Sequence, residues 1–367
     1  TSLASLFNSI FCRFPMTEIC FFLLDLFFLL FKPVKKPYVI GKKEQRMRKV
    51  ALGIDIGGTS IKSAFMDEEG TISQKFVLPV PKGEDQYVTM NRLIDACKVE
   101  IANLPEGDQL VGIGCGVPGA INTFTGFCDY SNNLGWRNLP VASLLEKALG
   151  YPVKIDNDAN AAMLGEIKFG CAKRYHNAVL ITIGTGIGGG LYLDDHLYVG
   201  NQGKGAELGH MVIVDNGIPC TCGRKGCLES YASATALLRF TKEAMEKHPE
   251  SLMWRLCPDI NQVGGALPFD AAKKGDAAAQ EVLDTYIHYL GEGCLNFANI
   301  FRPEAIILAG GVSKQGENLR RPLAQYLEDR GYGFGTGLVP KVDILISELG
   351  ADMGIYGAGA LGFNVAK

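Results

Sequence analysis

From Val50 onward, short apolar segments that end in glycine-rich turns alternate with longer segments of helical periodicity. This alternation is typical of an α/β fold whose strands are mostly internal. The predicted strands span 50–56, 60–66, 72–78, 110–116, 153–156, 178–183, 189–193, 211–214, 304–309 and 342–346. The predicted helices span 85–103, 140–149, 159–169, 230–247, 277–300, 317–330 and 352–362, and Asp276 can cap the helix that begins at 277.

The first 46 residues do not share this pattern. All 45 glycines of the 367-residue chain lie from Gly41 onward, whereas eight of the 19 phenylalanines lie within the first 31 residues. The apolar run 19–31 contains Asp25 and is shorter than the roughly 20 residues that a bilayer span needs. Basic residues follow this run, whereas they precede the apolar run of a signal peptide. We expect 1–46 to be an extension outside the folded core, and its presence in the native protein stays open; a membrane anchor is the alternative.

Charge and cysteine content exclude several classes of protein. The chain has 36 basic and 39 acidic side chains, so there is no electrostatic basis for binding nucleic acid. Eleven cysteines are too few for a disulfide-stapled scaffold of this length. Their number is odd and three lie between 220 and 227, which points to a local site and a reducing compartment. We therefore expect a cytoplasmic protein without nucleic-acid or membrane partners.

Two glycine hairpins of one design occur in the two halves of the chain. Residues 54–59 read IDIGGT and residues 181–186 read ITIGTG, and each joins two apolar strands. This echo suggests a duplicated architecture with a ligand cleft between two lobes. The alternative is a purely structural role, in which these glycines only form tight turns. Together, however, the loops favour a phosphate clamp, because glycine turns let backbone N–H groups approach a phosphate closely.

Neither loop fits a dinucleotide-binding fingerprint. Gly184, Gly186 and Gly189 match its spacing, as do Gly114, Gly116 and Gly119, but no helix follows either set. Asp55, two residues ahead of the first glycine pair, could hold Mg²⁺ through water.

Four potential zinc ligands lie within 18 residues: His210, Cys220, Cys222 and Cys227. Nitrogen and sulfur donors suit tetrahedral Zn²⁺, and a site filled entirely by protein ligands is structural rather than catalytic. Gly217, Pro219, Gly223 and Gly226 supply the turns that so short a loop requires. Three free cysteines beside an unrelated histidine would be the alternative.

Several polar residues are candidates for substrate chemistry. Asp158 lies between a predicted strand and a predicted helix, so it either caps that helix or accepts a proton from a substrate hydroxyl, with Asn157 orienting the substrate. Glu207 and Glu229 bracket the zinc loop, which would hold them in place to accept hydrogen bonds from hydroxyl groups. An isolated glutamate is more often a solvated surface charge.

An ordered set of motifs resembles the ROK family of sugar kinases and repressors. The motifs are DIGGT (55–59), GVPGAIN (116–122), NLGW (133–136), DNDANAA (156–162), GTGIGGG (184–190), GAELGH (205–210), CTCGRKGCLE (220–229) and LAGGVS (308–313). The resemblance runs from about Met47 to the C-terminus, and the cysteine motif is its most specific element. It implies an α/β fold of the two-lobed, actin-like and ribonuclease H-like type, with a ligand cleft between the lobes and a structural zinc loop.

The resemblance also implies a role for each matching residue. Asp158 would be the general base that takes the proton from a sugar 6-hydroxyl, whose oxygen then attacks the γ-phosphate of ATP. Sugar-hydroxyl ligands would be Asn157, Glu207, His210 and Glu229, with Gly119 and Asn132 as weaker candidates. The phosphates would lie at Gly57, Gly58, Thr59, Gly184, Thr185 and Gly186, and the adenosine side at Gly310 and Gly311.

By the same analogy, the small lobe would span 47–163 and be completed by a C-terminal helix at 351–367, and the large lobe would span 164–350. The implied activity is ATP-dependent phosphorylation of a hexose, with glucose expected first. The alternatives are N-acetylmannosamine, N-acetylglucosamine, fructose or allose. A sugar-responsive repressor would need a helix-turn-helix domain ahead of residue 47, and the sequence of 1–46 has no such helix pair. The family resemblance implies a homodimer or homotetramer.

Overall fold

The computed structural model describes residues 47–365. The predicted extension 1–46 lies outside the described residues. None of the helices between 47 and 365 is both long and apolar enough to cross a bilayer.

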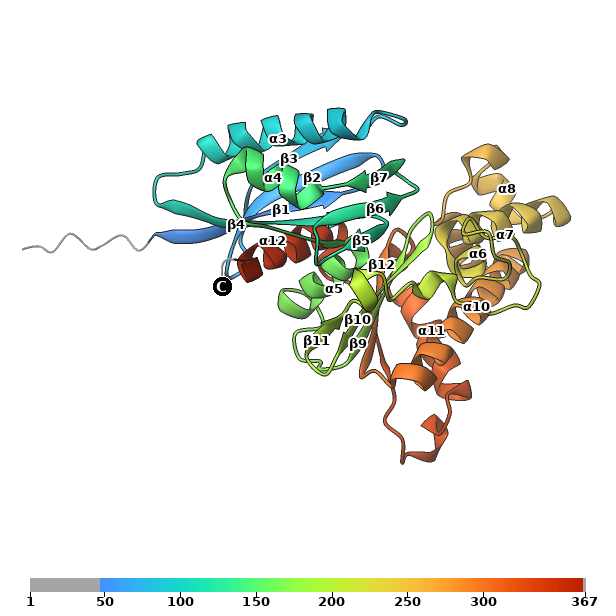
Figure 1. The fold of residues 1–367 in the computed structure, drawn as a ribbon. Helices are drawn as coiled ribbons and strands as arrows, with labels where there is room; N and C mark the ends of the chain where they lie inside the picture. The colour runs from blue at the N-terminus through green and yellow to red at the C-terminus, as the bar shows by residue number, and fades with distance from the viewer. Residues whose placement is uncertain (1–46, 366–367) are drawn as a thin grey trace, which may run out of the picture. The chain divides into compact units, whose positions relative to one another are not determined.

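The described residues contain two five-stranded sheets with the same topology (Figure 1). In each, the first strand pairs antiparallel with the second and parallel with the fourth, which confirms the duplicated architecture expected from the two hairpins. The first sheet has the order β3 (Ile72–Pro79), β2 (Ser60–Asp67), β1 (Arg48–Ile56), β4 (Asp108–Val117), β8 (Val153–Asn157). The second has the order β11 (His196–Tyr198), β10 (Ile187–Leu193), β9 (Ala178–Ile183), β12 (Ala305–Gly310), β13 (Asp343–Ile346).

The first sheet has helices on both faces. On one face, α3 (Gln86–Ala102) and α4 (Val141–Leu149) bury their apolar sides with Leu52 and Ile54 of β1. On the other face lies the glycine-rich α12 (Met353–Val365) (Figure 1). A Cβ on Gly114 of β4 would overlap the carbonyl oxygen of Ala358, so the strand and the helix meet at backbone distance. The C-terminal helix is thus built into the first sheet.

Helix α5 (Asp158–Lys168) contacts both sheets. It packs against α12 and β4 on the side of the first sheet and against β10 on the side of the second. Its Met163 is fully buried with Leu180 and Ile307 of the second sheet. Because α5 begins directly after β8, its first residues lie where the two sheets come together.

The opposite face of the second sheet is covered by a helical layer. Helices α7 (Ala234–Lys247), α10 (Ala277–Phe301) and α11 (Glu317–Arg330) share one core with the buried residues of β9 and β12. The short helices α6 (Glu229–Ala232), α8 (Leu252–Leu256) and α9 (Leu267–Ala272) complete the layer. Asp276 caps α10 by accepting a hydrogen bond from the Ala279 N–H, as predicted.

The structure differs from the sequence-based expectations in several details. The predicted strand 211–214 is wrong, because Ile213 and Val214 both donate to the Gly226 carbonyl and only an isolated bridge joins Val212 to Cys227. The predicted helix 230–247 is broken at Ser233, which is extended and caps α7 through a hydrogen bond from the Ala236 N–H. A third sheet was not predicted; it consists of β5 (Ala120–Asn122), β6 (Phe127–Ser131) and β7 (Trp136–Leu139).

Candidate active site

Strand register brings the acidic residues Asp55 and Asp156 of the first sheet to the same end of the sheet. Asp55 of β1 pairs with Gly116 of β4, and Gly116 pairs in turn with Asp156 of β8. All three strands are parallel, so their carboxyl ends meet, which is where ligands bind in open α/β sheets. Asn157 and Asp158 follow directly from this edge.

Asp158 is the first residue of α5 and not its cap. Asn157 is the N-cap, and its side chain accepts hydrogen bonds from the N–H groups of Ala159 and Asn160. The alternative explanation of Asp158 as a capping residue is therefore wrong. Burial raises the pKa of the Asp158 carboxyl to about 6, and the negative charges of Asp55 and Glu207 act in the same direction. A carboxyl whose pKa lies close to neutrality is suited to accept a proton at physiological pH.

A buried pair of side chains that was not predicted from the sequence, Asp156 and Asn160, supports this helix start. Asp156 is 3% exposed and accepts hydrogen bonds from the Asn157 N–H (2.7 Å) and from the Asn160 side-chain amide (2.8 Å). The i, i+4 spacing of Asp156 and Asn160 is the feature that could have indicated it. This pair fixes the backbone from which the Asn157 and Asp158 side chains project.

The Asn157 side chain also reaches the first residues after β4. Its Nδ2 donates to the Gly119 carbonyl at 3.1 Å, which brings two sugar candidates together. Gly119 has a φ of 120°, and a Cβ there would overlap the Tyr130 carbonyl oxygen, so this position requires glycine. Asn132 is exposed and accepts a hydrogen bond from the Tyr130 hydroxyl, whereas its neighbour Asn133 packs against Gly58.

The first glycine hairpin, Gly57 to Thr59, connects β1 and β2. It is closed by a hydrogen bond from the Gly57 N–H to the Ser60 carbonyl (2.9 Å). The Asp55 carboxylate lies against Gly354 in the first turn of α12, where a Cβ would overlap it. Burial raises the pKa of Asp55.

The second glycine hairpin, Gly184 to Gly186, lies beside the glycines that follow β12. Gly310 pairs with Ile183 across the sheet, and a Cβ on Gly310 would overlap the Ile183 carbonyl oxygen. Gly311 faces open space, with nothing within 4 Å of the position of an added Cβ. The two segments expected to contact the nucleotide are therefore adjacent.

Two carboxylates and a histidine lie next to this hairpin. Glu207 precedes a 3₁₀ turn, Leu208–His210, and the His210 N–H donates to its carbonyl. Burial raises the pKa of the Glu207 carboxyl, an effect that Glu229 reinforces and His210 opposes. Glu229 Oε2 accepts a hydrogen bond from the Ile187 N–H at 2.9 Å. Glu207, His210 and Glu229 are thus neighbours, and the charge of Glu207 reaches Asp158.

The four predicted metal ligands converge. One ligand atom from each of His210, Cys220, Cys222 and Cys227 lies within 4.8 Å of all the others. Cys220 Sγ is 3.6 Å from His210 Nδ1, and Cys222 Sγ is 3.6 Å from Cys227 Sγ. A tetrahedral zinc ion with Zn–S bonds of about 2.3 Å separates two sulfurs by roughly 3.8 Å, so the donor set and spacing fit Zn²⁺. The Nδ1 of His210 faces the cysteines, which leaves its Nε2 for another partner.

The backbone of the loop supports this arrangement. The Cys220 N–H donates to the Arg224 carbonyl (2.8 Å) and the Gly226 N–H to the Ile218 carbonyl (2.8 Å). Gly226 has a φ of 82°, and a Cβ there would overlap the Val214 carbonyl oxygen. The sequence-based assignment of turn glycines to this loop therefore holds at Gly226.

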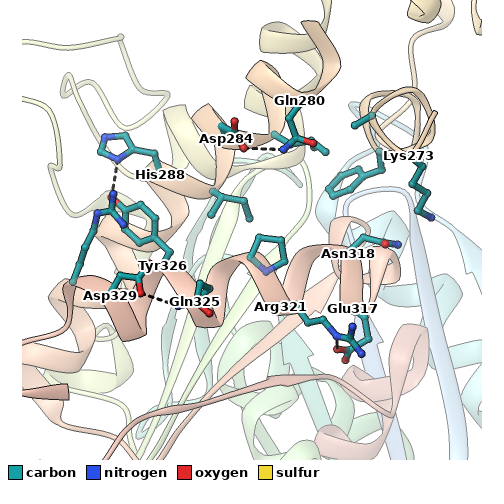
Figure 2. Close-up of a pocket in the computed structure, with 16 residues that line it drawn as sticks. Lys273, Gln280, Asp284, His288, Glu317, Asn318, Arg321, Gln325, Tyr326 and Asp329 are labelled. Atoms are coloured by element: carbon teal, nitrogen blue, oxygen red, sulfur yellow. Dashed lines mark hydrogen bonds and ion pairs between the residues drawn. The ribbon is translucent and has the colours of Figure 1, made fainter. Parts of the chain in front are cut away.

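A surface hollow of about 720 Å³ lies elsewhere, between α10 and α11 (Figure 2). Its polar side chains pair with one another: Gln280 with Asp284, His288 with Tyr326, and Arg321 with Glu317. None of the candidate residues lines it.

Comparisons with known proteins find a glucokinase and a xylose repressor among the relatives of this chain. The chain is 38% identical over 319 residues to the glucokinase of Halalkalibacterium halodurans, which covers 84% of this chain and 94% of the relative. It is 32% identical over 316 residues to the xylose repressor of Bacillus spizizenii, covering 85% of this chain and 76% of the relative.

Among solved structures, a ROK family glucokinase from Streptomyces griseus in complex with glucose and AMPPNP superposes with a TM-score of 0.72. Its identity is 32%, and the match covers 86% of this chain and 99% of that structure. The ROK family model matches residues 51–364. The chain therefore belongs to the ROK family, and it has the two-lobed, actin-like fold of the ROK sugar kinases.

Proposed function

We propose that this chain is an ATP-dependent hexose kinase that phosphorylates glucose at its 6-hydroxyl. The observation that carries the proposal is the position of Asp158. Its carboxyl, with a pKa of about 6, starts the helix that contacts both sheets, and it is close enough to Asp55 and Glu207 to interact with their charges. The similarity to glucokinases, one of them solved with glucose and AMPPNP, supports this assignment.

In this proposal, each group of residues has one task. Asp158 accepts the proton of the 6-hydroxyl, so that the oxygen can attack the γ-phosphate of ATP in line. Asn157, Glu207, His210 and Glu229 bind the sugar hydroxyls, with Gly119 and Asn132 at the margin of the sugar. The backbone N–H groups of the two hairpins hold the phosphates, and Gly310 and Gly311 border the adenosine. Catalysis then rests on positioning and on compensation of charge.

Two metal ions belong to the proposal. Zn²⁺ bound by His210 and the three cysteines is structural: it fixes the loop that carries Glu207 and Glu229. Asp55 would hold Mg²⁺ through water, and a bound Mg²⁺ neutralises phosphate charge. The Nε2 of His210 then faces the sugar.

The proposed kinase also has an expected domain organisation, location and assembly. Lobes at 47–163, completed by 351–367, and at 164–350 would close around the sugar, because an ATP site open to water would waste ATP. A cytoplasmic location is supported by the nine cysteines of the described part of the chain, none of which forms a disulfide. A role in glycolysis and assembly into a homodimer or homotetramer belong to the same proposal.

An assay of ADP release with four sugars tests the proposed kinase activity. Zinc-replete protein is assayed with glucose, N-acetylmannosamine, N-acetylglucosamine and fructose, and Asp158→Asn serves as the background for ATP hydrolysis. The highest kcat/KM is expected with glucose. A preference for another of these sugars would reassign the substrate and keep the kinase.

The second candidate function is a sugar-responsive repressor, which the similarity to a xylose repressor favours. If calorimetry detects sugar binding but ADP is released with none of the four sugars, the repressor is supported and the kinase is contradicted.

A further inference from the structure

The space beside Gly186 is occupied by a carboxylate from the sugar side. A Cβ added to Gly186 would overlap Oε2 of Glu229 and lie 3.0 Å from its Cδ. The φ of Gly186 lies outside the left-handed region, so its backbone conformation does not require glycine. The reason for glycine at this position is therefore the neighbouring carboxylate and not the turn itself.

The next residue of the same turn holds that carboxylate. The Ile187 N–H donates to Glu229 Oε2 at 2.9 Å. A Cβ on Gly209 would overlap the Ile187 carbonyl oxygen, so the segment of Glu207 and His210 lies against the same residue. The peptide that joins Gly186 to Ile187 thus holds the Glu229 carboxylate, and the carbonyl of Ile187 lies against the segment that carries Glu207 and His210.

The rest of the turn is hydrogen-bonded to the first residues of α7. The Ala234 N–H at the start of α7 donates to the Gly184 carbonyl (2.9 Å), and the Thr235 hydroxyl donates to the Thr185 carbonyl (2.8 Å). The turn therefore has little freedom to move away from an added methyl group. The carboxylate of Glu229, at the end of a flexible side chain, is the group that would have to move.

We propose that Gly186 is a positioning residue for the sugar site: the missing side chain leaves room for the Glu229 carboxylate to bind the Ile187 N–H and face the sugar. The glycine of a turn assigned to phosphate binding thereby also fixes a sugar ligand. This inference rests on the proposed function, because it takes Glu229 as a ligand of sugar hydroxyls.

Gly186→Ala tests the inference through sugar binding measured by calorimetry without ATP. The displaced carboxylate loses its bond to Ile187 and its position toward the sugar. We expect glucose affinity to fall roughly tenfold or more, the size of one lost hydrogen bond to a charged group. Gly264→Ala, outside the site and with nothing within 4 Å of its added Cβ, is the matched control, and its glucose affinity should stay within about twofold of the wild type.

A rescue separates steric displacement from misfolding. Glu229→Asp shortens the side chain and gives the new methyl group room, so Gly186→Ala should cost less than about threefold in glucose affinity in that background. An equal loss in both backgrounds, or a rise in the KM for ATP with unchanged glucose affinity, would overturn the inference. Because binding is measured without turnover, a wild-type protein that binds glucose but releases no ADP would contradict the proposed function and leave this test intact.

Discussion

The two sheets share one topology, yet their first hairpins carry different chemistry. In the first sheet the residue two positions before the glycine pair is Asp55, which pairs with Gly116. In the second sheet the matching residue is Thr182, which pairs with Ala309 and whose hydroxyl accepts a hydrogen bond from the Gly188 N–H of its own hairpin. One hairpin thus directs a carboxylate toward Asp158, whereas the other satisfies its polar group internally.

The surroundings of the hairpins differ in the same way. The first hairpin is next to α12, whose glycines allow the helix to contact the strands closely. The second hairpin is next to the zinc loop and to α6, which carries Glu229. Two sheets of the same topology can therefore carry different functional groups. In the proposed function, the end of the first sheet carries the base Asp158 and the sugar ligand Asn157, whereas the segments beside the second hairpin carry Glu207, His210 and Glu229.

The largest expected effect comes from removing the base. Asp158→Asn should lower kcat by about 10²–10⁴-fold, the usual contribution of a general base, while glucose affinity changes little. At neutral pH the substitution should also stabilise the fold by about 1–3 kcal/mol, because burial raises the pKa of Asp158 to about 6 and its ionised form opposes folding. Steady-state kinetics, calorimetry and thermal unfolding measure the three effects.

A matched control is Asp284→Asn, at a carboxylate in the hollow between α10 and α11 that bonds to Gln280. It should leave kcat unchanged. Turnover of Asp158→Asn equal to that of the wild type would remove Asp158 from the role of base.

Loss of the metal should affect the second sheet's part of the site. Chelation or Cys222→Ala is expected to release one zinc ion per chain, to weaken glucose binding and to lower the Tm by several degrees. Metal analysis, calorimetry and thermal unfolding give the readouts, and Cys257→Ala, outside the cluster, is the control. Purified protein that holds no zinc and has an unchanged Tm after chelation would contradict the assignment.

The smallest expected effect compares a glycine that close packing requires with a glycine that faces open space. Gly114→Ala should destabilise the protein by about 1–3 kcal/mol, because the methyl group would overlap the Ala358 carbonyl of α12. Gly184→Ala faces open space and should change the free energy of unfolding by less than about 0.5 kcal/mol. Denaturant unfolding compares them. Equal stabilities would mean that α12 does not pack this closely on β4.

Much of the fold could be predicted because, in a long periodic segment, the spacing of the apolar residues indicates which face is buried. The helix 317–330 and the strand 178–183 agree with the structure at both ends. The strands β5 to β7 were missed because they are three to five residues long and lie in a segment rich in turn residues. The break at Ser233 was missed because a capping serine inside an apolar pattern does not interrupt the helical period.

The candidate site also has parts that could be predicted from the sequence and parts that could not. The cluster of His210, Cys220, Cys222 and Cys227 could be predicted because the four donor side chains lie close together in the sequence, within one short loop. The role of Asn157 as the helix cap could not, because Asn157 and Asp158 are both good caps and only the backbone decides between them. The contact of Gly186 with Glu229 joins residues 43 positions apart, and no local pattern encodes it.

The pH dependence of kcat/KM for glucose tests the central claim most directly. Because Asp158 must be ionised to accept the proton and its pKa is about 6, kcat/KM should fall as the pH decreases through this value, approaching tenfold per pH unit below it. At pH 8 the value should be at its plateau. A kcat/KM that stays constant from pH 8 down to pH 5, in protein that remains folded, would contradict the assignment of Asp158 as the base between the two sheets.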